Sequence, residues 1–195
     1  MSLPVDYFDA LYAKSPDPWA FETSPYERAK YAATLAALPR PRYGRALEVG
    51  CAIGVLTALL APRCEALLAL DGAEAALEQA RLRVAALPQV RIRRAWVPGD
   101  WPQAEGPQAD GPFDLILLSE VIYYLQAAEV ADLARRVRET AAPGADILAV
   151  HWTGETDYPM TGDAAAEAFI AALGPKVRIL RQDRQPEYRL DLLRL

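Results

Sequence analysis

Five short apolar runs are spaced through the middle of the chain and predict buried β-strands. They lie at Ala46–Val49, Ala66–Leu70, Val90–Val97, Phe113–Ser119 and Asp146–Val150. Nearly continuous apolar runs of this length are typical of parallel strands that are covered on both faces. The pattern therefore predicts an α/β fold.

Helical patterns follow most of these runs. They are found at Val55–Ala61, Gly72–Ala86, Ala127–Ala142 and Asp163–Leu173. Strands that alternate with helices indicate βαβ units, which build one doubly wound sheet.

Two more strands end the chain, Lys176–Arg181 and Tyr188–Leu193, and the short segment QDRQPE joins them. A segment this short can form a hairpin but not a helical crossover, so the last strand must run antiparallel. We predict a single domain with a seven-stranded, mostly parallel sheet, an antiparallel last strand near one edge and helices on both faces.

The N-terminal part of the chain precedes this core and predicts a helical extension. Val5–Ala13 has aromatic and apolar residues at helical spacing, and a second helix is predicted over Pro25–Leu38 after a proline-rich interruption. We therefore divide the chain into an N-terminal lid, residues 1–44, and a core, residues 45–195.

The turn after the first core strand has the pattern of a nucleoside-binding site. Gly50 lets the backbone turn sharply, and the helix that begins at Val55 directs free N–H groups toward this turn. Asp71 follows the next strand, where an acid can bind ribose hydroxyls. A dinucleotide fingerprint would need glycine at positions 52 and 55, which are Ala52 and Val55. The spacing thus favours a cofactor with one nucleoside.

Composition limits the partners and the compartment. The 195 residues are 52% hydrophobic and carry a net charge of −5, which fits one well-filled core and argues against nucleic acid as a partner. No apolar stretch approaches the roughly 18 residues of a membrane span, and the N-terminus lacks a signal-peptide pattern. Cys51 and Cys64 are the only cysteines and suit reduced thiols. We expect a cytoplasmic protein without a metal, as a monomer or weak dimer.

Ligands of such sheets bind beyond the carboxyl ends of the strands. Polar and aromatic residues are predicted at those ends in Glu48–Gly54, Asp71, Pro98–Trp101, Ser119–Tyr124 and His151–Trp152. Together they predict a single site.

Glu48 to Gly54 has the pattern E-x-G-x-x-x-G, which resembles the first motif of class I S-adenosyl-L-methionine (SAM)-dependent methyltransferases. The resemblance implies a Rossmann-like methyltransferase fold, with Glu48 near the methionine amino group of SAM. It also implies that Asp100 and Trp101 hold adenine. Ala52 stands where the motif usually has its middle glycine. The residues expected to bind SAM, or its product S-adenosyl-L-homocysteine (SAH), are Glu48, Gly50, Cys51, Ala52, Gly54, Asp71, Gly72, Asp100, Trp101 and Ser119.

Three longer segments narrow the resemblance. DPWAFETSPYERAKYAATLAAL, which is Asp17–Leu38, is followed by LEVGCAIGVLT and by FDLILLSEVIYYL. These segments are similar to the nodulation protein S (NodS)-type family of SAM-dependent N-methyltransferases. Members of known activity methylate the free amine at the non-reducing end of a deacetylated chitooligosaccharide. The resemblance therefore implies a small-molecule acceptor, an amino sugar or a related oligosaccharide.

An amine acceptor must lose its proton before or during methyl transfer. Glu120, at the end of the fourth predicted strand, is our first candidate for the base and can also attract a cationic amine; its alternative role is to cap the next helix. His151, the only histidine, is the second candidate because its ordinary pKa of about 6.5 suits proton transfer. A lone histidine at a strand end is also often structural.

Aromatic side chains and one arginine near the strand ends are candidates for binding the acceptor. These candidates are Trp19, Tyr26, Arg28 and Tyr31 in the lid, and Tyr123 and Tyr124 after the fourth strand. Ring faces with acids nearby suit a cationic sugar. Packing against the sheet is the alternative explanation for each ring.

Two other functions remain open on the sequence. One is methyl transfer to a different small O- or N-acceptor, for which the loops Pro98–Pro112 and Thr153–Gly162 leave room. The other is a non-catalytic module that keeps the fold, which Ala52 in the cofactor turn would suit. Binding of SAH separates the module from the enzymes, and a screen of acceptors separates the two enzymes.

Overall fold

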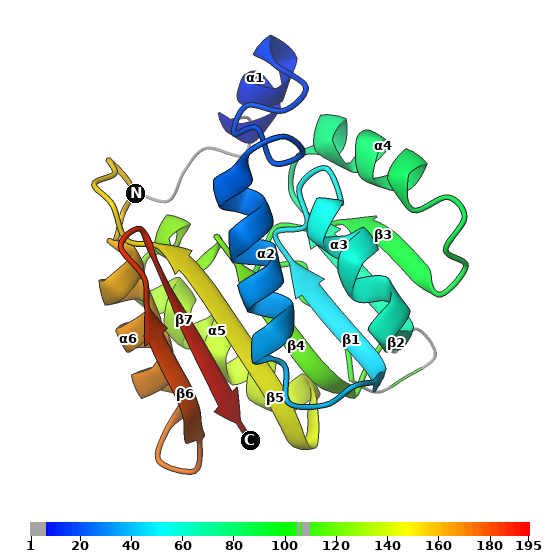
Figure 1. Ribbon diagram of the computed structural model, residues 1–195. Coiled ribbons are helices and arrows are strands. Elements are labelled where there is room, and N and C mark those ends of the chain that lie inside the picture. The colour runs from blue at the N-terminus through cyan, green and yellow to red at the C-terminus, as the bar shows by residue number, and fades with distance from the viewer. Residues whose placement is uncertain (1–6, 105, 107–109) are drawn as a thin grey trace.

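The computed structural model describes residues 7–104, 106 and 110–195. The predicted start of the first helix at Val5, and part of the loop predicted over Pro98–Pro112, lie outside the described residues. Helices cover both faces of a central sheet (Figure 1). The predicted fold class is confirmed.

One seven-stranded sheet runs in the order β3-β2-β1-β4-β5-β7-β6. Its strands are β1 Tyr43–Val49, β2 Cys64–Asp71, β3 Val90–Arg94, β4 Phe113–Ser119, β5 Ala141–Trp152, β6 Arg178–Arg184 and β7 Tyr188–Arg194. Strands β1 to β5 pair in parallel, and β7 lies between β5 and β6, antiparallel to both. This confirms the antiparallel last strand. The hairpin is tighter than QDRQPE, because β6 continues to Arg184 and only residues 185–187 join it to β7.

Helices pack on the two faces according to the alternation of side chains along the strands. They are α1 Tyr7–Lys14, α2 Pro25–Ala37, α3 Val55–Leu60, α4 Glu74–Arg83, α5 Ala127–Thr140 and α6 Gly162–Leu173. Leu47 and Val49 of β1 share a core cluster with residues of α5 and α6. Ala46 shares the other large cluster with residues of α2 and α3, which lie in front of the sheet in Figure 1. Glu48 points to the same side as Ala46, because side chains two apart on a strand share a face.

The N-terminal extension forms helices α1 and α2 as predicted. Ser24 caps α2, since its Oγ accepts the Glu27 N–H at 3.3 Å, and Pro25 occupies the first helical position. Helix α1 lies beside the start of α4, where Asp9 accepts the Glu74 N–H at 3.2 Å. Helix α1 lies beyond the carboxyl end of the sheet, whereas α2 runs along the front face with its N-terminal end toward that edge (Figure 1).

The third strand is shorter than predicted, because β3 ends at Arg94 and not at Val97. Beyond it the chain closes into a turn. The Trp96 N–H donates to Asp100 Oδ2 at 2.9 Å, and the Asp100 N–H donates to the Trp96 carbonyl at 2.9 Å. This turn decides which tryptophan faces the site.

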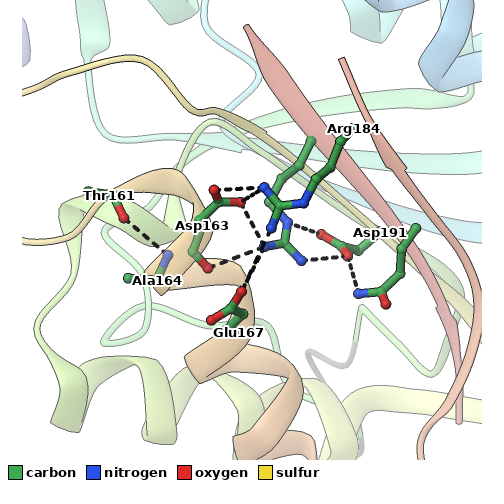
Figure 2. A network of polar contacts seen from close by, with 8 residues as sticks. Thr161, Asp163, Ala164, Glu167, Arg184 and Asp191 are labelled. Carbon is green, nitrogen blue, oxygen red and sulfur yellow. Dashed lines mark hydrogen bonds and ion pairs between the residues drawn. The ribbon is translucent and has the colours of Figure 1, made fainter. Parts of the chain in front are cut away.

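A buried ion-pair network fastens the edge hairpin to α6 (Figure 2). Arg189 on β7 donates to both carboxylate oxygens of Asp191, at 2.8 and 2.9 Å, and reaches Asp163 in the first turn of α6 at 2.9 Å. Arg184 pairs with the same Asp163 from the outer strand at 2.7 Å. Since Arg189 and Asp191 are almost completely buried, losing either one would leave an uncompensated charge. The network fixes the far end of the loop that follows β5.

Within the described part of the chain, no helix combines the length and the apolar character needed to cross a bilayer. The same residues include no group of three or more His, Cys, Asp and Glu side chains placed to hold a metal ion. Both cysteines are buried free thiols.

Candidate active site

A cavity of about 390 Å³ lies at the carboxyl ends of the parallel strands, beneath α1 and α2. A smaller cavity of about 40 Å³ adjoins it and shares seven of its wall residues. The shared wall consists of Phe21, Glu27, Lys30, Gly50, Ala52, Ser119 and Glu120. Residues at the carboxyl ends of β1 to β5 therefore line one cavity, although the predicted segment Pro98–Trp101 is not among them.

The turn between β1 and α3 brings the backbone to the cavity wall. Gly50, Ala52 and Gly54 all have positive φ, at 84°, 47° and 78°. At Gly50 an added Cβ would lie 2.4 Å from the Ser119 carbonyl oxygen, so only glycine fits there. Gly54 lines neither cavity and instead lies against Ala80 of α4, where an added Cβ would come within 3.0 Å. The absence of a side chain at Gly54 lets α4 approach the glycine turn.

Asp71 joins the two turns that frame the cavity. Its Oδ2 accepts the Ala52 N–H at 2.9 Å and its Oδ1 accepts the Ala73 N–H at 3.0 Å. Burial raises the pKa of Asp71, while these backbone donors oppose that rise. Each carboxylate oxygen can accept a second hydrogen bond. Asp71 can therefore bind hydroxyls in the cavity without giving up its structural contacts.

The aromatic wall beside Asp71 is Trp96, and not Trp101 as predicted. Trp101 is buried away from the cavity and donates its indole N–H to Thr140 Oγ1 at 3.0 Å. Asp100 closes the turn after β3 and lines neither cavity. The prediction was wrong because β3 ends three residues early. Trp96 thereby reaches the wall, where its ring lies so close to Gly72 that an added Cβ would be 2.7 Å away.

Glu120 lies in the wall of both cavities and is held by three donors. Its Oε1 accepts from Lys30 Nζ at 2.6 Å, and its Oε2 accepts from Tyr123 OH at 2.8 Å and from the Trp152 N–H at 2.8 Å. Its backbone has a φ of 57°, a conformation that non-glycine residues rarely adopt. The carboxylate is therefore fixed in position.

Lys30 is the functional residue that the sequence prediction missed. It is 3% exposed, and its Nζ lies 2.6 Å from Glu120 and 3.1 Å from Glu27. Burial lowers its pKa, but the two carboxylates outweigh burial and the net shift is upward. Glu27, Lys30, Tyr31 and Thr34 form the buried stripe of α2. Two charged residues on the buried side of a predicted helix were the signal in the sequence that could have identified Lys30.

His151 is not placed to exchange a proton with an acceptor. It is completely buried, lines neither cavity, and its Nε2 accepts the Ile122 N–H at 3.2 Å. Burial lowers its pKa to about 4. The neutral ring supports the short turn Ile122–Tyr124, and with it the position of Tyr123, whose ring centroid is 5.5 Å away.

Most of the remaining wall is aromatic. Tyr123 and Tyr124 line the main cavity as predicted, and the ring of Tyr158 lies 5.3 Å from the first and 4.7 Å from the second, between centroids. Trp19 and Tyr26 line it from the lid. The other aromatic residues in the wall are Phe8, Tyr12, Phe21, Trp96 and Trp152.

Two N-terminal residues that were predicted to bind the acceptor do not line the main cavity. Arg28 lies on the exposed side of α2, and its guanidinium donates to the Thr23 carbonyl at 2.8 Å, so it does not line the cavity. The reason is the helical period: Arg28 lies off the stripe that carries Glu27 and Lys30. Tyr31 lines the small cavity only.

The acid of the glycine motif is sealed inside the protein. Glu48 is completely buried, lines neither cavity, and neither carboxylate oxygen has a hydrogen-bond partner of ordinary geometry among the described residues. Burial raises its pKa to about 7. Of the neighbouring predicted cofactor residues, Cys51 lines the small cavity and Ser119 lines both.

Comparison with known proteins identifies relatives over most of the chain. The sequence model of the family described as Nodulation protein S (NodS) matches residues 10–145. Nodulation protein S of Bradyrhizobium diazoefficiens is 37% identical over 157 residues, which are 80% of this chain and 72% of that protein. Nodulation protein S of Rhizobium tropici is 34% identical over 68% of this chain and 53% of its own length.

Solved structures show the same fold. A candidate methyltransferase from Pseudomonas syringae is 37% identical, with a TM-score of 0.73, and the match covers 87% of this chain and 99% of that one. The N-methyltransferase NodS from Bradyrhizobium japonicum WM9, crystallised with SAH, is 21% identical with a TM-score of 0.78 over 97% of both chains.

Proposed function

The chain belongs to the nodulation protein S (NodS) family of SAM-dependent methyltransferases, and we propose that it methylates the free amine of an amino sugar or of a deacetylated chitooligosaccharide-like acceptor. The description of the Bradyrhizobium japonicum protein as an N-methyltransferase supports nitrogen as the target. The observation that carries the proposal is the Glu120 carboxylate inside an aromatic cavity. A carboxylate attracts an ammonium group, and ring faces pack on the C–H faces of a sugar.

SAM supplies an electrophilic methyl group on a sulfonium. We propose that the ring of Trp96 holds the adenine and that Asp71 binds the ribose, since both line the main cavity. The absence of a side chain at Gly50 lets the cofactor lie against the backbone beside Ser119. The free lone pairs of Asp71 and this uncovered backbone fit a nucleoside cofactor.

Glu120 is the proposed proton acceptor. An ammonium group has no lone pair, so the amine must be deprotonated when it attacks. The donors Lys30, Tyr123 and Trp152 hold the Glu120 carboxylate in one orientation. The aromatic walls favour deprotonation of the acceptor, because a water-poor cavity disfavours the ammonium form and lowers the pKa of the bound amine.

Residues 1–44 are the proposed lid. Phe8, Trp19 and Tyr26 of this segment line the main cavity, and a cover of this kind excludes water during methyl transfer. We further propose a cytoplasmic enzyme, which the two free thiols suit. A monomer or weak dimer remains our prediction.

The test is methyl transfer from labelled SAM to glucosamine oligomers, read by mass. Fully N-acetylated oligomers are the control, because they differ only in lacking the free amine. We expect a gain of one methyl group on the free-amine oligomers alone.

Equal labelling of both oligomer series would overturn the amine as the target. No labelling of either, in a protein that binds SAH, would overturn the amino-sugar acceptor and favour another small O- or N-acceptor. Failure to bind SAH would favour the non-catalytic module.

A further inference from the structure

The small cavity beside the glycine turn has three charged residues in its wall, Glu27, Lys30 and Glu120, and the mechanism gives no role to Glu27. On one side are Cys51 and Ala52 of the turn, and on the other are Glu27 and Lys30 of the lid helix α2. Its volume of about 40 Å³ leaves room for small polar groups, since roughly 10–15 Å³ of such space already holds one water molecule.

Glu27 presents a carboxylate oxygen that lacks a full set of partners. Its Oε1 accepts from Lys30 at 3.1 Å, while Oε2 is buried without a hydrogen bond of ordinary geometry in the described part of the chain. The Tyr31 hydroxyl is near enough to interact with the carboxylate, but an oxygen of this kind has a second lone pair. The side chain is only 8% exposed, so a donor on a ligand in the cavity would complete the hydrogen bonds of this carboxylate.

Lys30 has capacity left as well. Its ammonium group has three N–H donors, and the side-chain acceptors found for it are Glu27 and Glu120. The ring of Tyr26 is the remaining neighbour, with its centroid 5.1 Å from Nζ, so one N–H has no oxygen acceptor among these residues. Glu27 and Lys30 are three residues apart on one helix, and together they offer an anion and a cation to the same small space.

An α-amino acid has the complementary pair of charges, an ammonium and a carboxylate on one carbon. The order of residues around the site shows where such a group would lie. Trp96 and Asp71 line the main cavity only, whereas Gly50 and Ala52 line both cavities. If the nucleoside of a cofactor lies at Trp96 and Asp71, the rest of the cofactor can extend past the glycine turn toward Glu27.

We propose that Glu27 and Lys30 hold the amino-acid end of SAM, with the Glu27 carboxylate accepting from the ammonium group and the Lys30 ammonium donating to the carboxylate. The inference rests on the proposed cofactor site. It replaces the role expected for Glu48, which is sealed off from both cavities.

The arrangement also couples cofactor binding to the lid. Lys30 contacts Glu120 at 2.6 Å, so the same ammonium group touches the proposed base and the proposed cofactor site. A bound cofactor would fix α2, and α2 in turn would fix the proton acceptor.

The test compares three ligands by titration calorimetry. SAH has both charged groups, its decarboxylated analogue has only the ammonium group, and 5′-methylthioadenosine has neither. The variants are Glu27→Gln and Lys30→Arg, which keep size or charge, with Glu48→Gln as the rival. Arg28→Gln is the matched control, because Arg28 lies on the exposed side of the same helix and lines neither cavity.

We expect Glu27→Gln to weaken SAH and its decarboxylated analogue by about tenfold or more, as for a lost charge-assisted hydrogen bond. Lys30→Arg should weaken SAH alone, because an Arg fork does not fit the small cavity. Unchanged binding of 5′-methylthioadenosine shows that each variant is folded. The control should match the wild type for all three ligands.

Equal affinity of wild type and Glu27→Gln for SAH would overturn the inference, as would a loss confined to Glu48→Gln. If the wild type bound neither SAH nor 5′-methylthioadenosine, the cofactor site itself would be wrong, which is a different failure.

Discussion

The Nζ of Lys30 lies 2.6 Å from Oε1 of Glu120, although the two residues are 90 positions apart in the chain. The contact joins helix α2 to the end of β4. The two side chains are 4% and 18% exposed, so water screens the ion pair weakly. The N-terminal helix α2 and the proposed base therefore form one electrostatic unit.

Replacing Glu120 tests its role as the proton acceptor. Glu120→Gln keeps the size of the side chain but removes its charge and most of its basicity. We expect turnover to fall at least about tenfold, as for loss of a general base, while SAH affinity stays within about twofold. Single-turnover methyl transfer and SAH calorimetry measure the two effects.

Tyr123→Phe is the matched control, because it removes one donor to Glu120 and keeps the aromatic wall. Its turnover should fall less than that of Glu120→Gln. Wild-type turnover in Glu120→Gln would remove this residue from the mechanism.

Lys30→Met should destabilise the protein, since Glu27 and Glu120 would face each other without a cation. Breaking a buried ion pair on one side costs about 3–5 kcal/mol. The cost should shrink as the pH falls, because burial raises the pKa of Glu27 and this carboxyl group then takes up a proton. Urea unfolding over a series of decreasing pH values measures this. Exposed Lys14→Met is the control, and an equal loss in both variants would contradict the argument.

Local sequence pattern was enough to predict most of the fold. The apolar runs located β1 to β5, and the shortness of the link before Tyr188 required an antiparallel last strand. These features depend on neighbours in the chain. The same holds for the glycine turn, whose positive φ angles follow from Gly50 and Gly54.

The missed features depend on contacts between distant segments. Lys30 could not be assigned because its partner Glu120 lies on another element, and a lysine on a helix is usually a solvated residue. Trp96 was passed over because the end of β3 is set by pairing with β2, and a shift of three residues exchanged one tryptophan for another.

The two tryptophans make a direct test of the adenine wall. Trp96→Ala should weaken SAH and 5′-methylthioadenosine equally, by about tenfold, because base–aromatic stacking contributes about 1–3 kcal/mol. Trp101→Phe removes the hydrogen bond to Thr140 and should lower thermal stability without changing either affinity. Calorimetry and melting curves separate the two effects, and the reverse pattern would restore Trp101 as the adenine residue.

Glu48 should make the ligand-free protein less stable as the pH rises. Its pKa is raised from 4.5 to about 7 by burial, so between these values the folded state holds a proton that the unfolded state has lost. The stabilising effect is complete below about pH 4.5 and is lost by about pH 7, a change of about 3 kcal/mol. Glu48→Gln should abolish this contribution. Urea unfolding from pH 4.5 to 8 measures it, and an unchanged pH dependence in the variant would contradict it.

His151 should act in the opposite direction over nearly the same range. Its pKa is lowered from 6.5 to about 4 by burial, so here the unfolded state holds the extra proton. Its stabilising effect is complete above about pH 6.5 and is lost as the pH falls toward 4, again by about 3 kcal/mol. The contributions of His151 and Glu48 therefore largely cancel in the wild type. His151→Gln, whose amide oxygen can still accept the Ile122 N–H, should reveal the loss of stability with rising pH, and Glu48→Gln should reveal the gain. The stability of the double variant should depend on pH least of all.

Since His151 lines neither cavity, His151→Gln should also keep turnover within about threefold, and a tenfold loss with intact SAH binding would return the histidine to the mechanism.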